Sequence, residues 1–500
     1  MKRNYNRYVI WICFHMLLSV CAQTAFAKPS ITPTVLEHAK KSVVTIQVTT
    51  SLSAYQQESK WYGTGFVIDR EAGYILTNQH VIGAAVIGTY EVTFYNGIRM
   101  QANLVYYDPW LDYGFLKVDP KMIPNDVKAS SFSLIDPCPD QPIFIIGNNE
   151  GNSLSLHTGT VASIYHVIGA MPQHAIRLSL NTRGGSSGSP VFNSKGQAIA
   201  LNYAGSNTFA YALHPAYIRY ALPFIKKGHT PIRKHIGAFV DTYSLTDAMR
   251  YNDFPVSKQQ AYLKQFPNSS STVIQVTNTL ANTPAASQLL PGDILWAING
   301  KEIGPSLVDF DLALNRVNKG DTIQLLIFRK GQWKELTLQV YDLEEHKIKK
   351  MVRFGGTVFF ESDDFFSHQG GEVPKTLTFA FTEPYTIFHQ VKHWAGYGQR
   401  CFRLKVLSFD GIPVKSLNDL VQRIPLLMAK KYFTMEYINT APICTYGSFF
   451  SDYQTGHNHY ISNVAYDSGL AEPTLYIFDN QEMQWVKKTI KSVVRVGAGS

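Results

Sequence analysis

Cysteine is scarce in this sequence of 500 residues. The chain has five cysteines, Cys13, Cys21, Cys138, Cys401 and Cys444. Their number and scattered spacing exclude a disulfide-rich framework, because such scaffolds place many cysteines in a short chain. One disulfide is the most that the last three allow, and Cys401 with Cys444 is the pairing that we favour. We interpret His457-x-His459 as a polar loop, so the sequence predicts no metal and no cofactor.

Charge is also low. Charged residues make up 17% of the chain and hydrophobic residues 45%, against about 25% charged in ordinary globular proteins. This composition excludes intrinsic disorder and coiled coil, and the length indicates several folded domains. The net charge of +9 is not gathered in one basic stripe, so we expect no nucleic-acid partner.

Long hydrophobic runs are absent outside the N-terminus, so we expect no stable membrane insertion of the mature chain. Residues 1–27 are predicted to be a signal peptide. The basic residues Lys2, Arg3 and Arg7 precede an apolar run over residues 8–20, and Ala25-Phe26-Ala27 supplies the small residues of a cleavage site before Lys28. A membrane anchor is disfavoured because about 13 apolar residues are too few to span about 30 Å of hydrocarbon.

The signal peptide predicts an exported protein. The periplasm is the compartment that we favour, with secretion as the alternative. A lipoprotein signal at Cys21 is a weaker alternative, because Val20 before it is bulky.

Residues 28–225 form the first predicted domain. From residue 42 onward, short β-branched and aromatic runs alternate with Gly, Asn, Asp and Pro, without interleaved amphipathic helices. This pattern favours antiparallel barrels or a sandwich over a parallel α/β sheet. One helix is predicted to start near Pro33, with Thr32 as its cap.

A basic stretch over residues 223–235 is interpreted as a connector to a second domain, residues 231–343. That domain is predicted to contain strands over residues 273–277 and 294–298, a hairpin turn at Asn299-Gly300 and a short helix over residues 309–318. Residues 321–329 and 333–340 are predicted to form a hairpin.

A third domain is predicted over residues 352–440. Its segment 403–420 parallels residues 293–303 and the helix that follows them, which indicates a degenerate repeat. Residues 441–500 show strand-like patches and form a C-terminal extension of unknown role.

A glycine- and serine-rich loop, Gly184-Gly185-Ser186-Ser187-Gly188-Ser189-Pro190, has the composition that a nucleophile loop needs, since backbone N–H groups can crowd around a serine oxygen there. Ser186 also fits the G-x-S-x-G elbow of α/β-hydrolases. That elbow requires a helix after the serine, whereas Pro190-Val191-Phe192 is predicted to be extended. We therefore favour Ser187.

Two further residues complete a catalytic hypothesis. His80 ends an apolar strand-like run, and Asp112 directly precedes another. Taken singly, such residues are more often structural. His80, Asp112 and Ser187 nevertheless follow one another in the order of the chymotrypsin-like triad, in which the imidazole takes the serine proton and the carboxylate orients the imidazole.

The segments GTGFVIDREAGYILTNQHVI, YDPWLDYGFLKVD and GGSSGSPVFN resemble the His, Asp and Ser motifs of the HtrA/Deg family of serine endoproteases. Residues 231–343 are similar to the PDZ domain of that family, and residues 352–440 resemble it more weakly. Ser186 and Ser189 depart from the common bacterial form G-N-S-G-G-P, and this variant is closer to the eukaryotic branch.

The resemblance implies a mostly β protein with a chymotrypsin-like double β-barrel protease domain, followed by two PDZ-like α+β domains. It implies that His80 is general base and then general acid, that Asp112 orients it and that Ser187 attacks. The N–H groups of Gly185 and Ser187 are implied to form the oxyanion hole.

The resemblance also implies binding sites. Leu201, Asn202 and Tyr203 are predicted to line the primary substrate pocket, and no acidic residue among them would attract a basic side chain. We therefore expect a small or medium apolar residue before the scissile bond. Ile236 and Gly237, with Ala238, resemble the loop that binds a peptide carboxylate.

The expected function is that of an exported endoprotease that degrades unfolded or damaged proteins in envelope quality control. Its expected partners are unfolded protein or peptide substrates, and the resemblance implies a homotrimer or a larger oligomer. The alternative is a chaperone or peptide-binding scaffold that keeps the protease fold with little turnover.

Overall fold

The computed structural model of the protein describes residues 31–491 apart from residues 55–58, 84–85, 109, 150–151, 168–173, 268, 280–282, 319, 363–375, 384–385, 389–402, 441–458, 468 and 470. The predicted signal peptide, the cysteines Cys401 and Cys444, and His457 lie outside the described residues, so the predictions about them stay predictions. Cys138 is an exposed free thiol.

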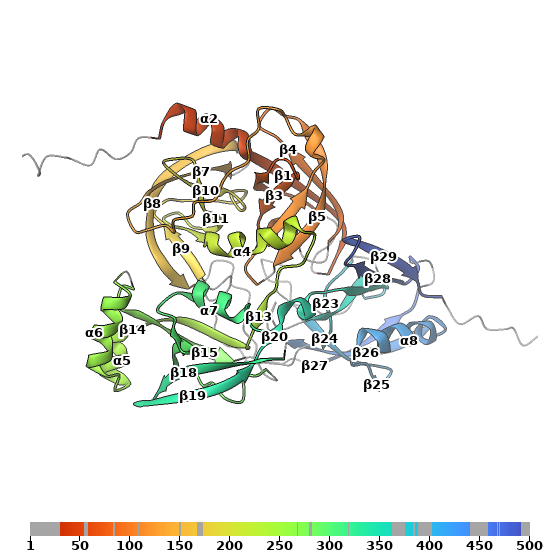
Figure 1. The fold of residues 1–500 in the computed structure, drawn as a ribbon. Coiled ribbons are helices and arrows are strands. Elements are labelled where there is room, and N and C mark those ends of the chain that lie inside the picture. Colours follow the sequence, from red (N-terminus) through yellow and green to blue (C-terminus); the bar gives the residue numbers. More distant parts are fainter. Residues whose placement is uncertain are drawn as a thin grey trace, which may run out of the picture.

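Two closed antiparallel β-barrels form the first half of the described chain (Figure 1). The strand order is β1-β2-β3-β6-β5-β4 in the first barrel and β10-β11-β12-β9-β8-β7 in the second. The first barrel comprises β1 (Val43–Ser53), β2 (Ser59–Asp69), β3 (Tyr74–Thr77), β4 (Val86–Thr93), β5 (Arg99–Asp108) and β6 (Tyr113–Lys117). The second comprises β7 (Pro142–Asn149), β8 (Asn152–Val167), β9 (His174–Leu178), β10 (Pro190–Asn193), β11 (Ala198–Gly205) and β12 (Ala210–Leu213). The predicted double barrel is confirmed.

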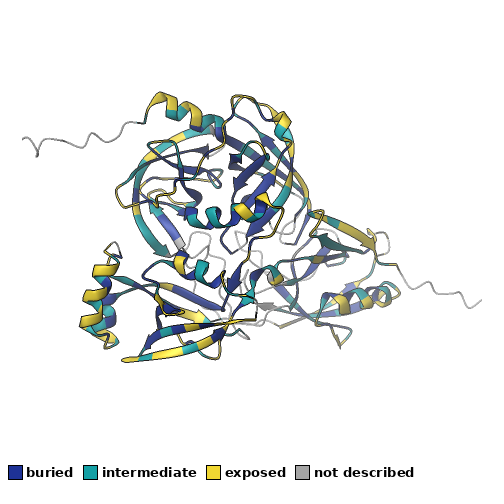
Figure 2. Cartoon of the chain, in the orientation of Figure 1, coloured by how far each residue is buried: buried dark blue, intermediate teal, exposed yellow. Residues whose placement is uncertain are grey.

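The sequence of β1 shows why these segments are strands. Val44, Ile46 and Val48 are buried, and the residues between them are partly exposed. Successive side chains of a strand point to opposite faces, so this alternation places β-branched residues inside the barrel. Figure 2 shows the strands of both barrels mostly buried.

Helix α4 (Pro215–Lys226) follows the second barrel and contains Pro223. We predicted a connector over residues 223–235. Its start was wrong, because residues 223–226 belong to this helix, whereas residues 227–233 lie outside helices and strands. A proline inside a helix removes one hydrogen bond, but α4 also buries Tyr217, Ile218 and Ala221 in the core shared by the two barrels. The apolar area that this face buries offsets the lost bond.

Three shorter helices complete the barrel region: α2 (Pro33–Ser42), α3 (Gln79–Ile82) and the 3₁₀ helix η1 (Pro120–Met122). The predicted helix near Pro33 is confirmed as α2, and the Thr32 hydroxyl accepts a hydrogen bond from the Val35 N–H at 3.3 Å. This is the usual N-cap contact.

The next unit has a sheet of order β14-β15-β16-β18-β19, with β17 paired to β16. Its strands are β13 (Lys234–His235), β14 (Ala238–Ser244), β15 (Thr272–Thr279), β16 (Ile294–Ile298), β17 (Lys301–Glu302), β18 (Thr322–Arg329), β19 (Gln332–Gln339) and β20 (Tyr341–Asp342). Its helices are α5 (Leu245–Tyr251), α6 (Val256–Gln265), α7 (Leu307–Leu314) and η2 (Leu343–His346).

The predicted hairpin turn of this unit is confirmed. Asn299 and Gly300, which form the turn between β16 and β17, have φ values of 49° and 77°. The predicted helix over residues 309–318 is α7, which begins two residues earlier after the cap Ser306 and is shorter. Helices α5 and α6 were not predicted.

The last unit has a nine-stranded sheet of order β27-β26-β24-β23-β22-β21-β28-β29, with β25 paired to β24. Its elements are β21 (Lys350–Phe354), β22 (Thr357–Ser362), β23 (Thr376–Thr382), β24 (Arg403–Phe409), β25 (Ile412–Pro413), α8 (Leu417–Met428), β26 (Tyr432–Thr440), β27 (His459–Ala465), β28 (Thr474–Asp479) and β29 (Gln484–Thr489). Its sheet therefore extends past the predicted boundary at residue 440.

The two C-terminal units share a strand order. The order β14-β15-β16-β18, with α7 before the last strand, matches β22-β23-β24-β26, with α8 before the last strand. This agreement supports the predicted repeat, and the PDZ assignment of the last unit stays a prediction.

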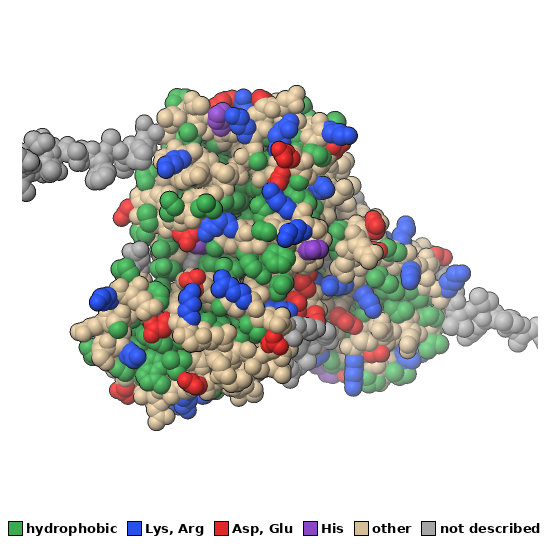
Figure 3. Space-filling view, viewed as in Figure 1, with side chains coloured by type: hydrophobic (Ala, Val, Ile, Leu, Met, Phe, Trp, Pro, Cys, Tyr) green, Lys and Arg blue, Asp and Glu red, His purple; other side chains and the backbone are tan. Residues whose placement is uncertain are grey.

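Both C-terminal units pack against the barrels. Phe239, Val308 and Leu343 join the core between the barrels, and Leu52 of β1 packs in a cluster with Met351 of β21. On the face seen in Figure 3, basic and acidic side chains are interspersed. Within the described residues, no helix is long and apolar enough to cross a membrane.

Candidate active site

His80 and Asp112 are brought together at the end of the first barrel. His80 lies in α3, directly after β3, and Asp112 lies between β5 and β6. The His80 Nδ1 and Asp112 Oδ2 atoms are 2.7 Å apart, and the His80 backbone N–H donates to Asp112 Oδ1 at 2.8 Å. Asp112 thus binds both the ring and the backbone of His80, which leaves the ring Nε2 as a proton acceptor.

Asp112 is held in an unusual backbone conformation. It is 1% exposed, its φ is 54°, and its carbonyl accepts a hydrogen bond from Asn78 Nδ2 at 2.8 Å. A non-glycine residue in the left-handed region persists where its surroundings hold it, and such residues cluster at functional sites. The segment that carries Asp112 is therefore held by contacts beyond the residue itself.

Ser187 lies on a tight loop before β10. The Ser186 N–H donates to Arg183 O and the Ser189 N–H to Ser186 O, both at 3.1 Å. Gly185 has a φ of 95°, and a side chain there would approach Asn148 O to 2.1 Å. Only glycine fits this position.

The predicted oxyanion donors are free within the described part of the chain. There, neither the Gly185 N–H nor the Ser187 N–H donates to a protein acceptor. Two unengaged backbone N–H groups beside a partly exposed serine can bind an oxyanion.

The Ser187 hydroxyl makes no hydrogen bond to His80. Its Oγ makes one hydrogen bond to the described residues, to Tyr203 O at 3.5 Å. Bonds between nucleophile and base are often long in structures without substrate. The structure thus pairs His80 with Asp112 and leaves Ser187 without a hydrogen bond to His80.

Ser186, the alternative nucleophile, is differently placed. Its side chain is buried, and its Oγ donates to Asn149 Oδ1 at 2.6 Å and contacts Arg183 O at 2.7 Å. The chain continues into strand β10, not into the helix that a hydrolase elbow requires. Both observations favour Ser187.

Thr64 of β2 connects the first barrel to the nucleophile loop. Its backbone N–H donates to Ser187 O at 2.8 Å, and its hydroxyl donates to Gly185 O at 2.7 Å. The same hydroxyl accepts from the Asn148 N–H at 2.9 Å, and the Thr77 hydroxyl donates to Thr64 O at 2.7 Å. Thr64 is fully buried, so it fixes the position of the loop relative to the strand that precedes His80.

Thr64 lies in the segment GTGFVIDREAGYILTNQHVI, but no local pattern in that segment indicates a role for it. A threonine in a strand carries no signal of a contact 121 residues away.

The three predicted pocket residues lie in β11 and are buried. The Asn202 N–H donates to Ser189 O and the Gly188 N–H to Asn202 O, both at 2.9 Å, while Asn202 Nδ2 donates to Ser186 O at 3.0 Å. Asn202 thus holds the nucleophile loop through hydrogen bonds of its backbone and of its side-chain amide. Leu201 and Tyr203 belong to the core between the barrels, and their assignment to the pocket stays a prediction.

The predicted peptide-binding loop, Ile236 to Ala238, is buried. The Gly237 N–H donates to His235 Nδ1 at 2.9 Å, and the Ala285 N–H donates to Ile236 O at 2.9 Å. A peptide carboxylate would have to displace His235 to reach the Gly237 N–H.

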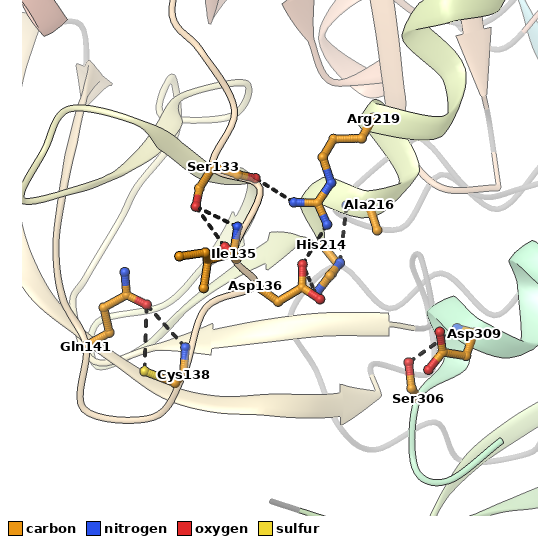
Figure 4. Close-up of polar contacts among 10 residues, drawn as sticks. All are labelled: Ser133, Ile135, Asp136, Cys138, Gln141, His214, Ala216, Arg219, Ser306 and Asp309. Carbon is orange, nitrogen blue, oxygen red and sulfur yellow. Dashed lines mark hydrogen bonds and ion pairs between the residues drawn. The ribbon is translucent and has the colours of Figure 1, made fainter. Parts of the chain in front are cut away.

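A loop between the barrels is anchored to α4 (Figure 4). Arg219 Nη1 donates to Ser133 O and Arg219 Nη2 to Asp136 Oδ1, each at 2.6 Å. Burial and the neighbouring Arg219 lower the pKa of His214 to about 3, so this histidine is neutral at physiological pH. In the same loop, the Cys138 N–H donates to Gln141 Oε1 at 3.2 Å.

The described residues contain no group of three or more His, Cys, Asp and Glu side chains that would hold a metal. His459, which we interpreted as part of a polar loop, lies in β27, and its Nε2 is 2.7 Å from Glu436 Oε1.

Family models match two parts of the chain. Residues 63–201 match the trypsin-like peptidase domain, and residues 256–340 match the PDZ domain. The first match contains His80, Asp112 and Ser187.

Several characterised and uncharacterised proteins are similar to the chain. It is 32% identical over 337 residues to the "Pro-apoptotic serine protease NMA111" of Meyerozyma guilliermondii, covering 64% of this chain and 33% of that protein. It is 27% identical over 425 residues to "Protease Do-like 7" of Arabidopsis thaliana, covering 79% of this chain and 37% of that protein. The chain therefore spans about a third of the length of these relatives.

A shorter relative is matched along nearly all of its length. The chain is 32% identical over 193 residues to "Uncharacterized protein RP187" of Rickettsia prowazekii, covering 38% of this chain and 98% of that protein. Among solved structures, "HtrA-type protease AlgW with tripeptide" aligns with a TM-score of 0.47 at 22% identity, covering 62% of this chain and 96% of that one.

Proposed function

Because the chain belongs to the HtrA/Deg family of PDZ-containing serine proteases, we propose that it is an exported serine endopeptidase that cleaves unfolded or damaged polypeptides. The resemblance seen in the motifs is confirmed by the two family models and by the fungal and plant relatives.

The contact between His80 and Asp112 carries the proposal. A buried carboxylate that accepts hydrogen bonds from both the ring and the backbone of a histidine fixes the ring's tautomer and its orientation. Ser187 lies on a loop tied to the same barrel through Thr64. Nucleophile, base and orienting carboxylate are the minimum set for acyl transfer.

The proposed reaction proceeds in two halves. As Ser187 Oγ attacks the scissile carbonyl carbon, its proton passes to His80 Nε2, and the carbonyl oxygen becomes an oxyanion held by the Gly185 and Ser187 N–H groups. The imidazolium then gives the proton to the leaving amine. Water hydrolyses the acyl-enzyme with His80 again as base and then acid.

We propose an apolar residue before the scissile bond, since β11 offers no acidic side chain among residues 201–203. The PDZ unit is proposed to bind exposed chain ends at residues 236–238. The burial of that loop supports a binding step in which His235 first releases the Gly237 N–H.

Export, a periplasmic site and a role in envelope quality control rest on the N-terminal sequence and on the family resemblance. A homotrimer or larger assembly rests on the resemblance alone. Sequencing of the mature N-terminus tests export, and the mass in solution tests the assembly.

The test compares the wild-type chain with Ser187→Ala on unfolded, fluorescently labelled casein. We expect degradation by the wild type, none by Ser187→Ala, and casein binding by both. Ser186→Ala is the matched control and should keep most of the activity. Equal turnover by wild type and Ser187→Ala would overturn the nucleophile, and binding without cleavage by the wild type would favour the scaffold alternative.

A further inference from the structure

We propose that Arg233, which lies between the trypsin-like peptidase domain and the PDZ domain, is a positioning residue for the catalytic aspartate Asp112. This inference rests on the proposed function, and it assigns to the junction of the two domains a part in building the active site.

Arg233 forms a buried ion pair with the barrel strand that leads to Asp112. Arg233 Nε and Asp108 Oδ2 are 2.5 Å apart, and both side chains are 3% exposed. Burial lowers the pKa of Arg233, but the carboxylates of Asp108 and Asp311 outweigh it and raise that pKa overall. A buried charge of this kind requires its partner, because removing one side leaves the other uncompensated.

The second oxygen of Asp108 holds the catalytic segment. Asp108 Oδ1 accepts hydrogen bonds from the backbone N–H groups of Trp110 and Leu111, both at 2.9 Å. Asp112 follows directly, in its left-handed conformation. One carboxylate therefore binds Arg233 with one oxygen and fixes the two residues before Asp112 with the other.

The position of Arg233 is set by the unit that spans residues 231–343, the first of the two C-terminal units. Its carbonyl accepts from the Leu343 N–H at 2.9 Å, and the next residue begins β13, which pairs with β20. The Lys234 N–H donates to Asn315 Oδ1 at 2.8 Å. The guanidinium that reaches Asp108 is thus anchored in the unit that contains the PDZ match.

Trp110 provides a second, independent contact between the same two regions. It is 4% exposed, and its ring centroid lies 4.7 Å from that of His235 and 5.9 Å from that of Phe239. The segment before Asp112 is therefore held by an ion pair and by an aromatic contact, and the partners of both come from residues 233–239.

The geometry predicts a specific kinetic defect. Without Arg233, the buried Asp108 carboxylate loses its ion-pair partner, and it is no longer held in one place beside the Asp112 segment. A displacement of about 1 Å in a catalytic group costs roughly 10²-fold in rate. Since Asp112 touches His80 and not the substrate, the loss falls on kcat while KM is unchanged.

The experiment uses the full chain and compares wild type, Arg233→Met, Asp108→Asn and the double variant. Turnover of casein is divided by the concentration of sites titrated with a fluorophosphonate, so that unfolded protein does not count. We expect Arg233→Met to lower kcat per titrated site roughly 10²-fold. The double variant should recover part of that loss, because the uncompensated carboxylate is gone.

Arg329→Met is the matched control. Arg329 binds Asp293 through Nε at 2.6 Å and Nη2 at 2.5 Å within the PDZ unit. Its loss also breaks an arginine–aspartate pair and lowers the melting temperature of that unit, but kcat per titrated site should equal that of the wild type. An equal fall in both variants would overturn the positioning role.

If Arg233→Met does not fold, Asp108→Asn decides the question, because it removes the same ion pair and preserves the volume of the site more closely. Wild-type kcat per titrated site in this folded variant would overturn the inference. A wild-type chain that neither cleaves casein nor reacts with the fluorophosphonate would overturn the proposed function itself, before any variant is compared.

Discussion

The two halves of the candidate active site differ in how completely they are assembled. In the first barrel, Asp112 binds His80 through two hydrogen bonds of 2.7 and 2.8 Å. In the second barrel, the backbone around Ser187 is fixed, but among the described residues the Ser187 hydroxyl makes a single hydrogen bond, of 3.5 Å, to Tyr203 O. The structure therefore orients the imidazole of the proposed base, while no hydrogen bond among the described residues joins the proposed nucleophile to it.

The difference also shows where each half gets its rigidity. The His80 half is held by side chains, including Asp108 and its partner Arg233. The Ser187 half is held through its own backbone groups, which bind the backbones and side chains of Thr64 and Asn202. Substitutions in the two halves should therefore lower kcat by different amounts.

The largest effect is expected from His80→Ala, which removes the base. Loss of a triad histidine typically costs about 10⁶-fold in kcat, as much as loss of the serine. The measurement is the kcat for casein in the His80→Ala variant and in the wild type. Activity within tenfold of wild type would show that the pair formed with Asp112 does not serve as the base.

Asp112→Asn should cost less, about 10⁴-fold in kcat. The amide preserves the shape of the site but no longer fixes the tautomer in which His80 Nε2 accepts a proton. The measurement is the kcat for casein, together with the melting temperature to establish that the variant is folded. A small loss would mean that orientation of His80 comes from elsewhere.

Gly185→Ala tests the Ser187 half and should lower kcat by about 10² to 10³-fold, the cost of losing one oxyanion donor. The added carbon would lie 2.1 Å from Asn148 O at a φ of 95°, so the loop must move. Gly184→Ala is the matched control, because a side chain there meets no atom within 4 Å of the described chain. Similar rates for the two variants would contradict the oxyanion assignment.

Thr64→Val should have the smallest effect, roughly tenfold in kcat. Valine keeps the shape of the side chain but leaves the buried Asn148 N–H and Gly185 O without their hydrogen-bond partner. An unsatisfied buried group of this kind destabilises the fold by about 1 to 3 kcal/mol. Thr64→Ser keeps the hydroxyl and should stay close to wild type. Wild-type activity in Thr64→Val, or a larger loss in Thr64→Ser than in Thr64→Val, would show that the hydroxyl bridge does not position the loop.

Much of this architecture was predictable because it depends on local sequence. The barrels follow from alternating β-branched runs such as β1, and the triad candidates follow from the order of His80, Asp112 and Ser187. The hairpin at Asn299-Gly300 follows from turn chemistry.

The remainder depends on long-range contacts that no local pattern reveals. Arg233 looked like part of a basic connector, yet it is buried against Asp108, 125 residues earlier. β28 pairs with β21 across the whole last unit, so strand-like patches near the C-terminus gave no sign of their partner. Pro223 was interpreted as the start of a connector, but it lies inside α4, whose apolar face packs in the core of the two barrels.

The most direct test of the account is the site of fluorophosphonate labelling in the full chain, determined by mass spectrometry of the labelled peptide. The account predicts label on Ser187, lost in His80→Ala and slowed in Asp112→Asn. Label on Ser186, or label on Ser187 at the wild-type rate in a folded His80→Ala variant, would contradict it.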